Sequence, residues 1–254
     1  MKRVTRISVS AVKGFRLSHP EDVRLGPAGV DENRRFLLVD AEGQRLRSSL
    51  TPWPVRVRAD YDAECERLRL RFSDGRTVDG DEVARGAQIQ STSGTLDVVG
   101  HVVEGPWEAP LSKLAGQPLR LARAACAGAG LNAPVTLVSD GSLTSLARAA
   151  GLHAIDPRRF RMLFELDGCA AHEEDTWEGR MLEIGSAVVC VGGPVDRCAV
   201  TTRDPETGER DLDTLRLLKE YRGQRESDGA VLFGVYASVE RPGLVRVGDA
   251  VALA

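Results

Sequence analysis

Cysteine is scarce in this chain, and its spacing is irregular. The 254 residues include five cysteines, an odd number, and none of them forms a Cys-x-x-Cys pair. Scattered cysteines argue against a disulfide framework, and the missing pairs argue against a structural zinc site or a cysteine-ligated iron–sulfur cluster. We therefore expect Cys65, Cys126, Cys169 and Cys190 to be reduced structural residues, and the fifth, Cys198, is considered below.

Long apolar runs and clusters of one charge are also missing. No stretch approaches the roughly 20 apolar residues of a membrane-spanning helix, and no signal-peptide core follows the basic N-terminus. Positive and negative charges are interspersed, with a formal net charge of −3, so no basic patch predicts a contact with nucleic acid. We expect a cytoplasmic protein that binds neither nucleic acid nor a membrane.

Aromatic residues make up only 5% of the chain, whereas there are 26 glycines, a composition that suits short strands joined by turns. Hydrophobic patterning predicts strands at 4–12, 68–72, 87–90, 96–103, 119–123, 135–138, 162–166, 181–191, 231–239 and 244–253. The turn signals between them predict a mainly β protein, whose N-terminal part is a closed or nearly closed antiparallel barrel.

A few helices interrupt this pattern. Helical spacing or capping signals predict them at 107–115, from Ser139 or Asp140 to Gly151, and at 212–221. The small, flexible run at 126–130 predicts a boundary between a domain of residues 1–125 and a domain of residues 126–254. The run from His172 to Asp175 has metal-binding residue types, but neighbours in sequence do not easily converge on one ion, so we expect an exposed acidic turn.

The most distinctive stretch is centred on Cys198. Arg197 precedes it on a short β-prone run, and turn residues follow at Asp204-Pro205 and Thr207-Gly208. An adjacent cation favours the thiolate, the form that binds a metal or attacks an electrophile. For a cysteine on its own, burial on a strand face is the commoner outcome. The stretch as a whole favours a functional thiol near a strand end.

This stretch and the segments around it resemble the MOSC family, named for the C-terminal domain of molybdenum cofactor sulfurases. The matching segments are, in order, 174–177, 184–185, 197–202, 204–208, 215–222, 233–236 and 242–249. The resemblance implies a MOSC β-barrel in residues 126–254, preceded by an N-terminal β-barrel-like domain in residues 1–125. It also implies that Cys198 is the protein ligand of molybdenum and the catalytic residue.

The resemblance further implies a set of cofactor-binding residues. Lys13 matches the lysine of a Pro-Val-Lys-Ser segment in amidoxime-reducing members of the family, although Gly14 replaces the serine. Arg35 matches an Arg-Phe arginine, and Arg161 matches the second arginine of an Arg-Phe-Arg-Pro-Asn segment; all three face the cofactor's phosphate in the family. Arg197 and Thr201, from the cysteine stretch, complete the set. Met162-Leu163 replaces the family's Pro-Asn pair.

The function implied by the resemblance is that of an oxidoreductase carrying the molybdenum cofactor (molybdenum bound to molybdopterin). Such an enzyme reduces small N-hydroxylated substrates. Because no electron-transfer domain follows the MOSC segments, we expect a separate donor: a flavoprotein, a ferredoxin-like protein or a haem protein. Two alternatives stay open: a non-catalytic cofactor carrier or sulfur-transfer module, and a metal-free thiol enzyme with Cys198 as its nucleophile.

Overall fold

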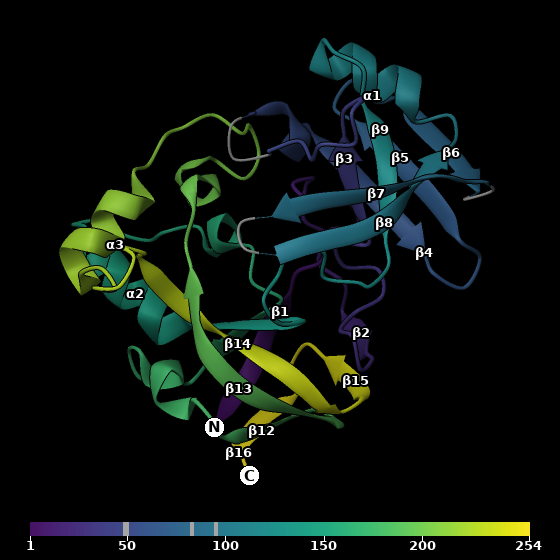
Figure 1. Cartoon of the computed structure of the whole chain (residues 1–254). Helices are drawn as coiled ribbons and strands as arrows, with labels where there is room; N and C mark the ends of the chain where they lie inside the picture. Colours follow the sequence, from purple (N-terminus) through teal and green to yellow (C-terminus); the bar gives the residue numbers. More distant parts are fainter. Residues whose placement is uncertain (48–50, 82–83, 94–95) are drawn as a thin grey trace.

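The computed structural model describes residues 1–47, 51–81, 84–93 and 96–254. Strands dominate this part of the chain, and three α-helices lie among them (Figure 1). The strands are β1 (Lys2–Ile7), β2 (Asp22–Leu25), β3 (Phe36–Val39), β4 (Val57–Asp62), β5 (Arg67–Phe72), β6 (Thr77–Asp81), β7 (Ala84–Ser93), β8 (Leu96–Glu104), β9 (Arg120–Ala124), β10 (Val135–Ser139), β11 (Phe164–Asp167), β12 (Met181–Ile184), β13 (Ala187–Asp196), β14 (Leu232–Arg241), β15 (Gly243–Arg246) and β16 (Ala250–Leu253). The α-helices are α1 (Glu108–Ala115), α2 (Asp140–Ala149) and α3 (Thr214–Arg222). The predicted mainly β class is confirmed.

Seven strands close into a barrel in the order β1-β11-β10-β14-β13-β12-β16. All neighbouring pairs are antiparallel except β10 and β11, which run parallel. The barrel predicted for the second half of the chain is therefore present. Its first strand comes from the N-terminus, since β1 pairs with both β11 and β16. The division at residue 125 stays a prediction, because the opening residues complete a barrel built by the later ones.

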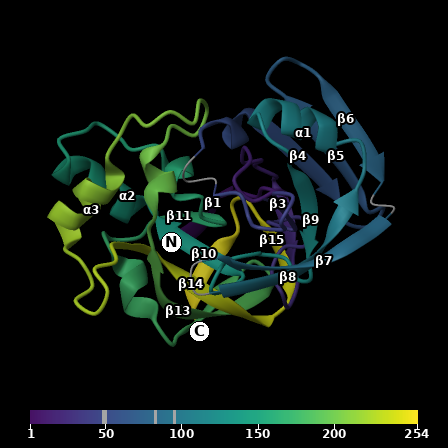
Figure 2. The same cartoon turned by 45° about the horizontal axis from the view of Figure 1, so that its top comes forward.

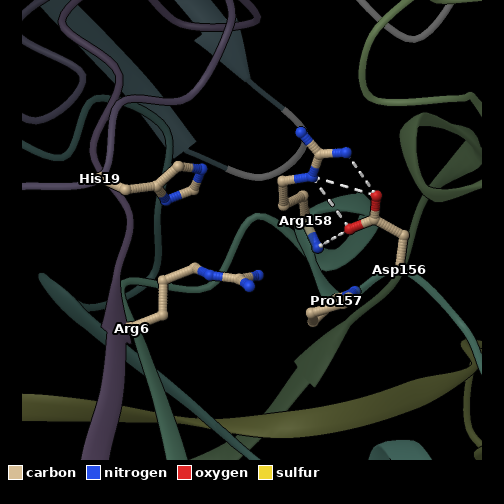
Figure 3. A pocket seen from close by; sticks show the side chains of 5 residues that line it. All are labelled: Arg6, His19, Asp156, Pro157 and Arg158. Atoms are coloured by element: carbon tan, nitrogen blue, oxygen red, sulfur yellow. Dashed lines mark hydrogen bonds and ion pairs between the residues drawn. The ribbon is translucent and has the colours of Figure 1, made fainter.

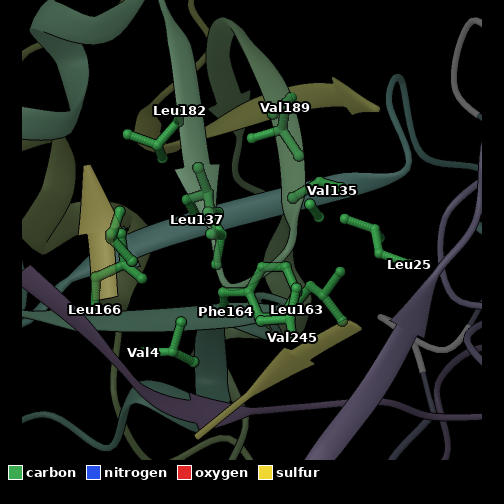
Figure 4. Close-up of a cluster of buried hydrophobic side chains, with 14 of the residues drawn as sticks. Val4, Leu25, Val135, Leu137, Leu163, Phe164, Leu166, Leu182, Val189 and Val245 are labelled. Atoms are coloured by element: carbon green, nitrogen blue, oxygen red, sulfur yellow. The ribbon is translucent and has the colours of Figure 1, made fainter. Parts of the chain in front are cut away.

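The barrel interior is filled by branched and aromatic side chains that alternate along its strands (Figure 4). Phe164 is fully buried among them, between Leu137 of the parallel neighbour and Val4 of β1. Alternation with period two places every second side chain inside a barrel, which explains the burial of this set. The interior is thus a packed core, and the functional groups must lie around it.

The N-terminal strands differ from the predicted barrel. Within the described residues they form one antiparallel sheet in the order β3-β9-β8-β7 and a second in the order β4-β5-β6. The two sheets share a core in which Phe36 of β3 meets Tyr61 of β4 edge-on, with ring centroids 4.9 Å apart. Sheets that pack face to face bury the same alternating pattern as a closed barrel, so alternation alone could not distinguish them. Figure 2 shows these sheets, with α1, beside the seven-stranded barrel.

The predicted helices are confirmed, with small shifts at their ends. Ser139 caps α2 by accepting a hydrogen bond from the amide of Ser142. Glu174 corrects the prediction of an exposed acidic turn, because it is only 1% exposed and accepts hydrogen bonds from the amide and hydroxyl of Ser139. A carboxylate at the start of a helix stabilises the helix dipole and its unpaired amides. No helix in the described residues is both long and apolar enough to span a membrane.

Candidate functional site

Cys198 lies two residues beyond the end of β13 and precedes a 3-10 helix, η4 (Ala199–Thr202). The predicted placement near a strand end is confirmed, whereas the residues after the cysteine form a helical turn and not a strand. The residue is exposed to solvent. The thiol therefore does not fill the core, as a structural cysteine would.

Two threonines hold the backbone of this cysteine. The hydroxyl of Thr201 donates to the Cys198 carbonyl oxygen at 3.0 Å, and Thr214, the first residue of α3, donates to the Thr201 hydroxyl at 2.6 Å. Both threonines are fully buried. In the structure Thr201 therefore positions the cysteine, and its direct contact with a cofactor stays a prediction.

The predicted turn after the cysteine stretch packs against the N-terminal half. Gly208 has a φ of +78°, and a Cβ added there would lie 1.9 Å from the carbonyl oxygen of Pro52. Arg16 and Arg56 bind the turn from the other half, with ion pairs of 2.7 Å to Glu206 and 3.0 Å to Glu209. The loop that carries the thiol is thereby fixed against both parts of the molecule.

Five cationic side chains from five separate segments lie within electrostatic reach of the Cys198 thiol. They are Lys13, Arg34, Arg45, Arg161 and Arg197. In each case burial lowers the pKa of the cation, and the charge of the cysteine opposes that shift. Cationic side chains gathered at one place form an anion-binding environment. We name these five residues the cation cluster.

The side chain of one of these arginines donates a hydrogen bond to the backbone of another. The Arg34 guanidinium donates to the Arg161 carbonyl oxygen at 3.1 Å, and the Arg161 guanidinium donates to the Phe15 carbonyl oxygen at 2.6 Å. Both arginines have left-handed backbones, with φ of 52° and 53°. Left-handed geometry is uncommon outside glycine, and its concentration at one place is a feature of functional sites.

Lys13 is brought to the cluster by a turn. Its amide donates to the Phe36 carbonyl oxygen at 2.8 Å, and its ammonium donates to the Gly130 carbonyl oxygen at 3.3 Å. Burial, then the charges of Arg34 and Arg45, lower its pKa to about 7. Gly14 follows with a φ of +93°, a conformation that glycine adopts without strain, which explains why glycine replaces the family's serine.

Arg197 is held by groups that the sequence could not identify. Its guanidinium donates to the Phe160 carbonyl oxygen and to the Met162 sulfur, at 3.3 Å for the latter, and stacks over the Phe160 ring at 5.4 Å. Its Nε is buried and has no hydrogen-bond partner among the described residues. The Met162-Leu163 replacement is therefore structural: Met162 orients Arg197, and Leu163 lies in the barrel core.

Of the predicted cofactor-binding residues, Lys13, Arg161 and Arg197 interact electrostatically with Cys198 in the structure, and their contact with a cofactor stays a prediction. Arg35 is half-buried, and the described interactions with Cys198 do not include it, so its role stays a prediction. Arg34 and Arg45 were missed. The signal for Arg34 was present in the Arg34-Arg35 pair, but a sequence cannot show which of two adjacent arginines turns inward when the first has a left-handed backbone.

A conventional metal cage is not part of this site. Within the described ranges, no three histidine, cysteine, aspartate or glutamate side chains converge to hold a metal ion. A metal here would need most of its ligands from a bound organic group, with the protein supplying Cys198.

Comparison with known proteins supports the resemblance seen in the sequence. The family model of the MOSC domain matches residues 124–252, just over half of the chain. The chain belongs to the MOSC domain family. The match begins at Ala124, the last residue of β9, and includes Arg161, Arg197 and Cys198, whereas Lys13 and Arg34 lie outside it.

Individual relatives agree with the placement of this chain in the MOSC domain family. It is 39% identical over 127 residues to mitochondrial amidoxime reducing component 2 from Homo sapiens, an alignment covering 46% of the chain and 36% of that protein. It is 28% identical over 250 residues to a molybdenum cofactor sulfurase from Anopheles gambiae, covering 85% of the chain and 31% of that protein. The chain thus spans about a third of the length of these relatives.

Proposed function

We propose that this MOSC protein binds the molybdenum cofactor through Cys198 and reduces small N-hydroxylated compounds. The observation that carries the proposal is the exposed thiol within electrostatic reach of five cationic side chains, four of which come from segments remote in sequence. The relatives named amidoxime reducing component and molybdenum cofactor sulfurase supply the chemical class.

The residues at the site fit this cofactor. A thiolate is the soft ligand that suits molybdenum, and clustered arginine and lysine side chains suit a terminal phosphate. The buried Arg197 Nε lacks a partner among the described residues, and an unpaired buried donor is costly unless a bound group satisfies it. We infer that Cys198 would hold the metal, while Lys13, Arg161 and Arg34 would hold the phosphate, together with the predicted Arg35.

When bound, the cofactor would supply a two-electron couple that accepts an oxygen atom. Reduction of an N-hydroxylated group consumes two electrons and two protons and releases the amine or amidine and water. The protein's part is to fix the thiol through Thr201 and to neutralise anionic charge with the cation cluster. The electrons would come from a separate protein: a flavoprotein, a ferredoxin-like protein or a haem protein.

Cofactor carriage or sulfur transfer is the second candidate. The alignment with the molybdenum cofactor sulfurase extends over 85% of the chain, whereas the alignment with the amidoxime reducing component covers under half. The same cysteine and cation cluster would then bind the cofactor without turnover. A metal-free thiol enzyme would use the same exposed cysteine but would need no molybdenum.

A reductase assay distinguishes these three candidate functions. Protein from a cofactor-competent host is mixed with an amidoxime and an artificial electron donor, and the amidine is quantified. The proposal predicts turnover that requires molybdenum and disappears in Cys198→Ala. Bound molybdenum without turnover favours the carrier, and equal turnover in metal-free protein favours the thiol enzyme.

A further inference from the structure

A cavity lies between β1, the segment after it and a short 3-10 helix, η2 (Pro157–Phe160). Its volume is about 410 Å³, within the usual range for small-molecule sites. It is lined by Arg6, His19, Asp156, Pro157 and Arg158 (Figure 3). None of these residues belongs to the cation cluster.

The two lining arginines differ in how fully they are paired. Arg158 is committed to Asp156 through a two-pronged ion pair, with a closest distance of 2.7 Å, and to Glu206. Arg6 is paired only through its Nη1, at 3.2 Å from the Glu165 carboxylate. Its Nε and Nη2 make no hydrogen bond to any described residue, and its side chain is 38% exposed. Arg6 therefore retains donors for a ligand.

The third basic group, His19, presents an acceptor. Its Nδ1 lies 3.2 Å from the Ile7 carbonyl oxygen and 3.1 Å from the Ser8 hydroxyl. We assign the proton of the neutral ring to Nδ1, because a carbonyl oxygen only accepts hydrogen bonds. Nε2 is then an acceptor, and it has no partner within the described part of the chain. Burial lowers the pKa of this ring, and so do the positive charges of Arg6, Arg158 and Arg58. The hydrogen bond to Ile7 opposes this shift, but the pKa is lowered on balance, which favours the neutral form.

The local charge balance indicates how much negative charge a ligand would bring. Around the cavity, Arg6 pairs with Glu165, Arg158 with Asp156, and Arg16 with Glu206. The charge of Arg58 also lowers the pKa of His19. The Nε of Arg58 donates to the Ser18 hydroxyl at 3.1 Å, and this partner carries no charge. Around the cavity, four arginines and three carboxylates thus leave an excess of one positive charge. This excess matches a monoanion better than a dianion.

We propose that this cavity binds a small monocarboxylate that carries a neighbouring hydroxyl group. The carboxylate accepts from the free Nε and Nη2 of Arg6, the planar fork that suits a carboxylate. The neighbouring donor binds Nε2 of His19. The site is independent of the proposed molybdenum chemistry, because it shares no residue with the cation cluster.

The test is an NMR titration of the full chain, following the His19 imidazole resonances together with the backbone amide resonances of the residues that line the cavity, which still report on binding in a variant of His19. Glycolate carries a carboxylate and an adjacent hydroxyl, acetate lacks the hydroxyl, and inorganic phosphate carries more charge. We expect saturable shifts with glycolate, binding about threefold or more weaker with acetate because one hydrogen bond is lost, and weaker binding with phosphate.

Variants assign the contacts. Arg6→Gln is expected to weaken glycolate binding at least about tenfold, as expected for a lost hydrogen bond to a charged group, and His19→Phe to make glycolate and acetate equivalent. Arg241→Gln removes an exposed arginine elsewhere and should change nothing. Should Arg6→Gln not fold, Arg6→Lys keeps a charge beside Glu165 but loses the fork, and should also bind more weakly. The proposal is overturned by absent shifts at about 100 mM glycolate, by tighter binding of phosphate, or by unchanged affinity in the Arg6 variants.

Discussion

Replacing Arg34 with glutamine tests the part of the site that the sequence did not reveal. Arg34 is half-buried, and its charge contributes to the lowered pKa of three neighbours, Lys13, Arg161 and Arg197. Its guanidinium donates a hydrogen bond to the Arg161 carbonyl oxygen. The variant removes a positive charge from a crowded cation cluster and keeps a side chain that can still donate.

Two opposing effects set the stability of the variant without ligand. Loss of the charged hydrogen bond costs about 1.5 kcal/mol, less if the glutamine amide replaces it. Two like unit charges about 8 Å apart at an effective dielectric of about 20 repel by about 2 kcal/mol. Arg34 repels three cationic neighbours, Lys13, Arg161 and Arg197. Relief of one such repulsion already exceeds the lost hydrogen bond by about 0.5 kcal/mol. We therefore expect the ligand-free variant to be more stable by at least about 0.5 kcal/mol, which corresponds to a rise in Tm of at least about 1 °C for a chain of this size.

Cofactor binding should change in the opposite direction. Losing one unit of attraction to an anionic phosphate costs about 2 kcal/mol, or about thirtyfold in affinity. The assay is Tm of metal-free protein together with the molybdenum and pterin content of protein from a cofactor-competent host, with Arg34→Lys and Arg35→Gln in parallel. Arg34→Lys should keep most of the cofactor, and Arg35→Gln tests the role that the family resemblance gives to Arg35. A lower Tm with unchanged cofactor content in Arg34→Gln would refute the reasoning.

Three further substitutions test the structural supports. Burial and Arg222, whose guanidinium donates to His172 Nδ1 at 3.0 Å, lower the pKa of His172 below 6.5, so folding favours its neutral form. The free energy of unfolding, followed by urea titration, should fall more steeply between pH 7 and 5 in the wild type than in His172→Gln. Gly208→Ala should cost about 3 kcal/mol, because the new Cβ would clash with Pro52 and the φ is positive; an unchanged urea midpoint would contradict this. Thr201→Val should cost about 2 kcal/mol by leaving buried polar groups unpaired, whereas Thr201→Ser should be nearly neutral in the same titration.

Much of the fold followed from local patterns. Alternating side chains placed most strands, and Ser139, Gly116 and Gly151 marked helix ends at or next to the observed positions. These features depend on residues close in sequence, so one chain suffices to find them. Whether the N-terminal strands close into one barrel or pack as two sheets depends on long-range pairing, which local alternation does not encode.

The candidate site could be predicted only in part, because some of its residues are identified by local sequence and others only by contacts with distant segments. Cys198 and Arg161 stand in recognisable segments, so their roles could be inferred from residue order. Arg34 could not, because its inward position depends on a left-handed backbone held by contacts from distant segments. Glu174 was misassigned because its partner, Ser139, is remote in sequence. A buried carboxylate is expected only when its partner is known.

The central claim is that the Cys198 sulfur is a ligand of molybdenum, and X-ray absorption at the molybdenum edge tests it most directly. Protein from a cofactor-competent host should show three sulfur neighbours at the metal, two from the pterin and one from the cysteine. Cys198→Ser should retain the two pterin sulfurs and lose the third. The account would be contradicted by an identical number of sulfur neighbours in the two proteins. It would also be contradicted by wild-type protein that acquires neither pterin nor molybdenum.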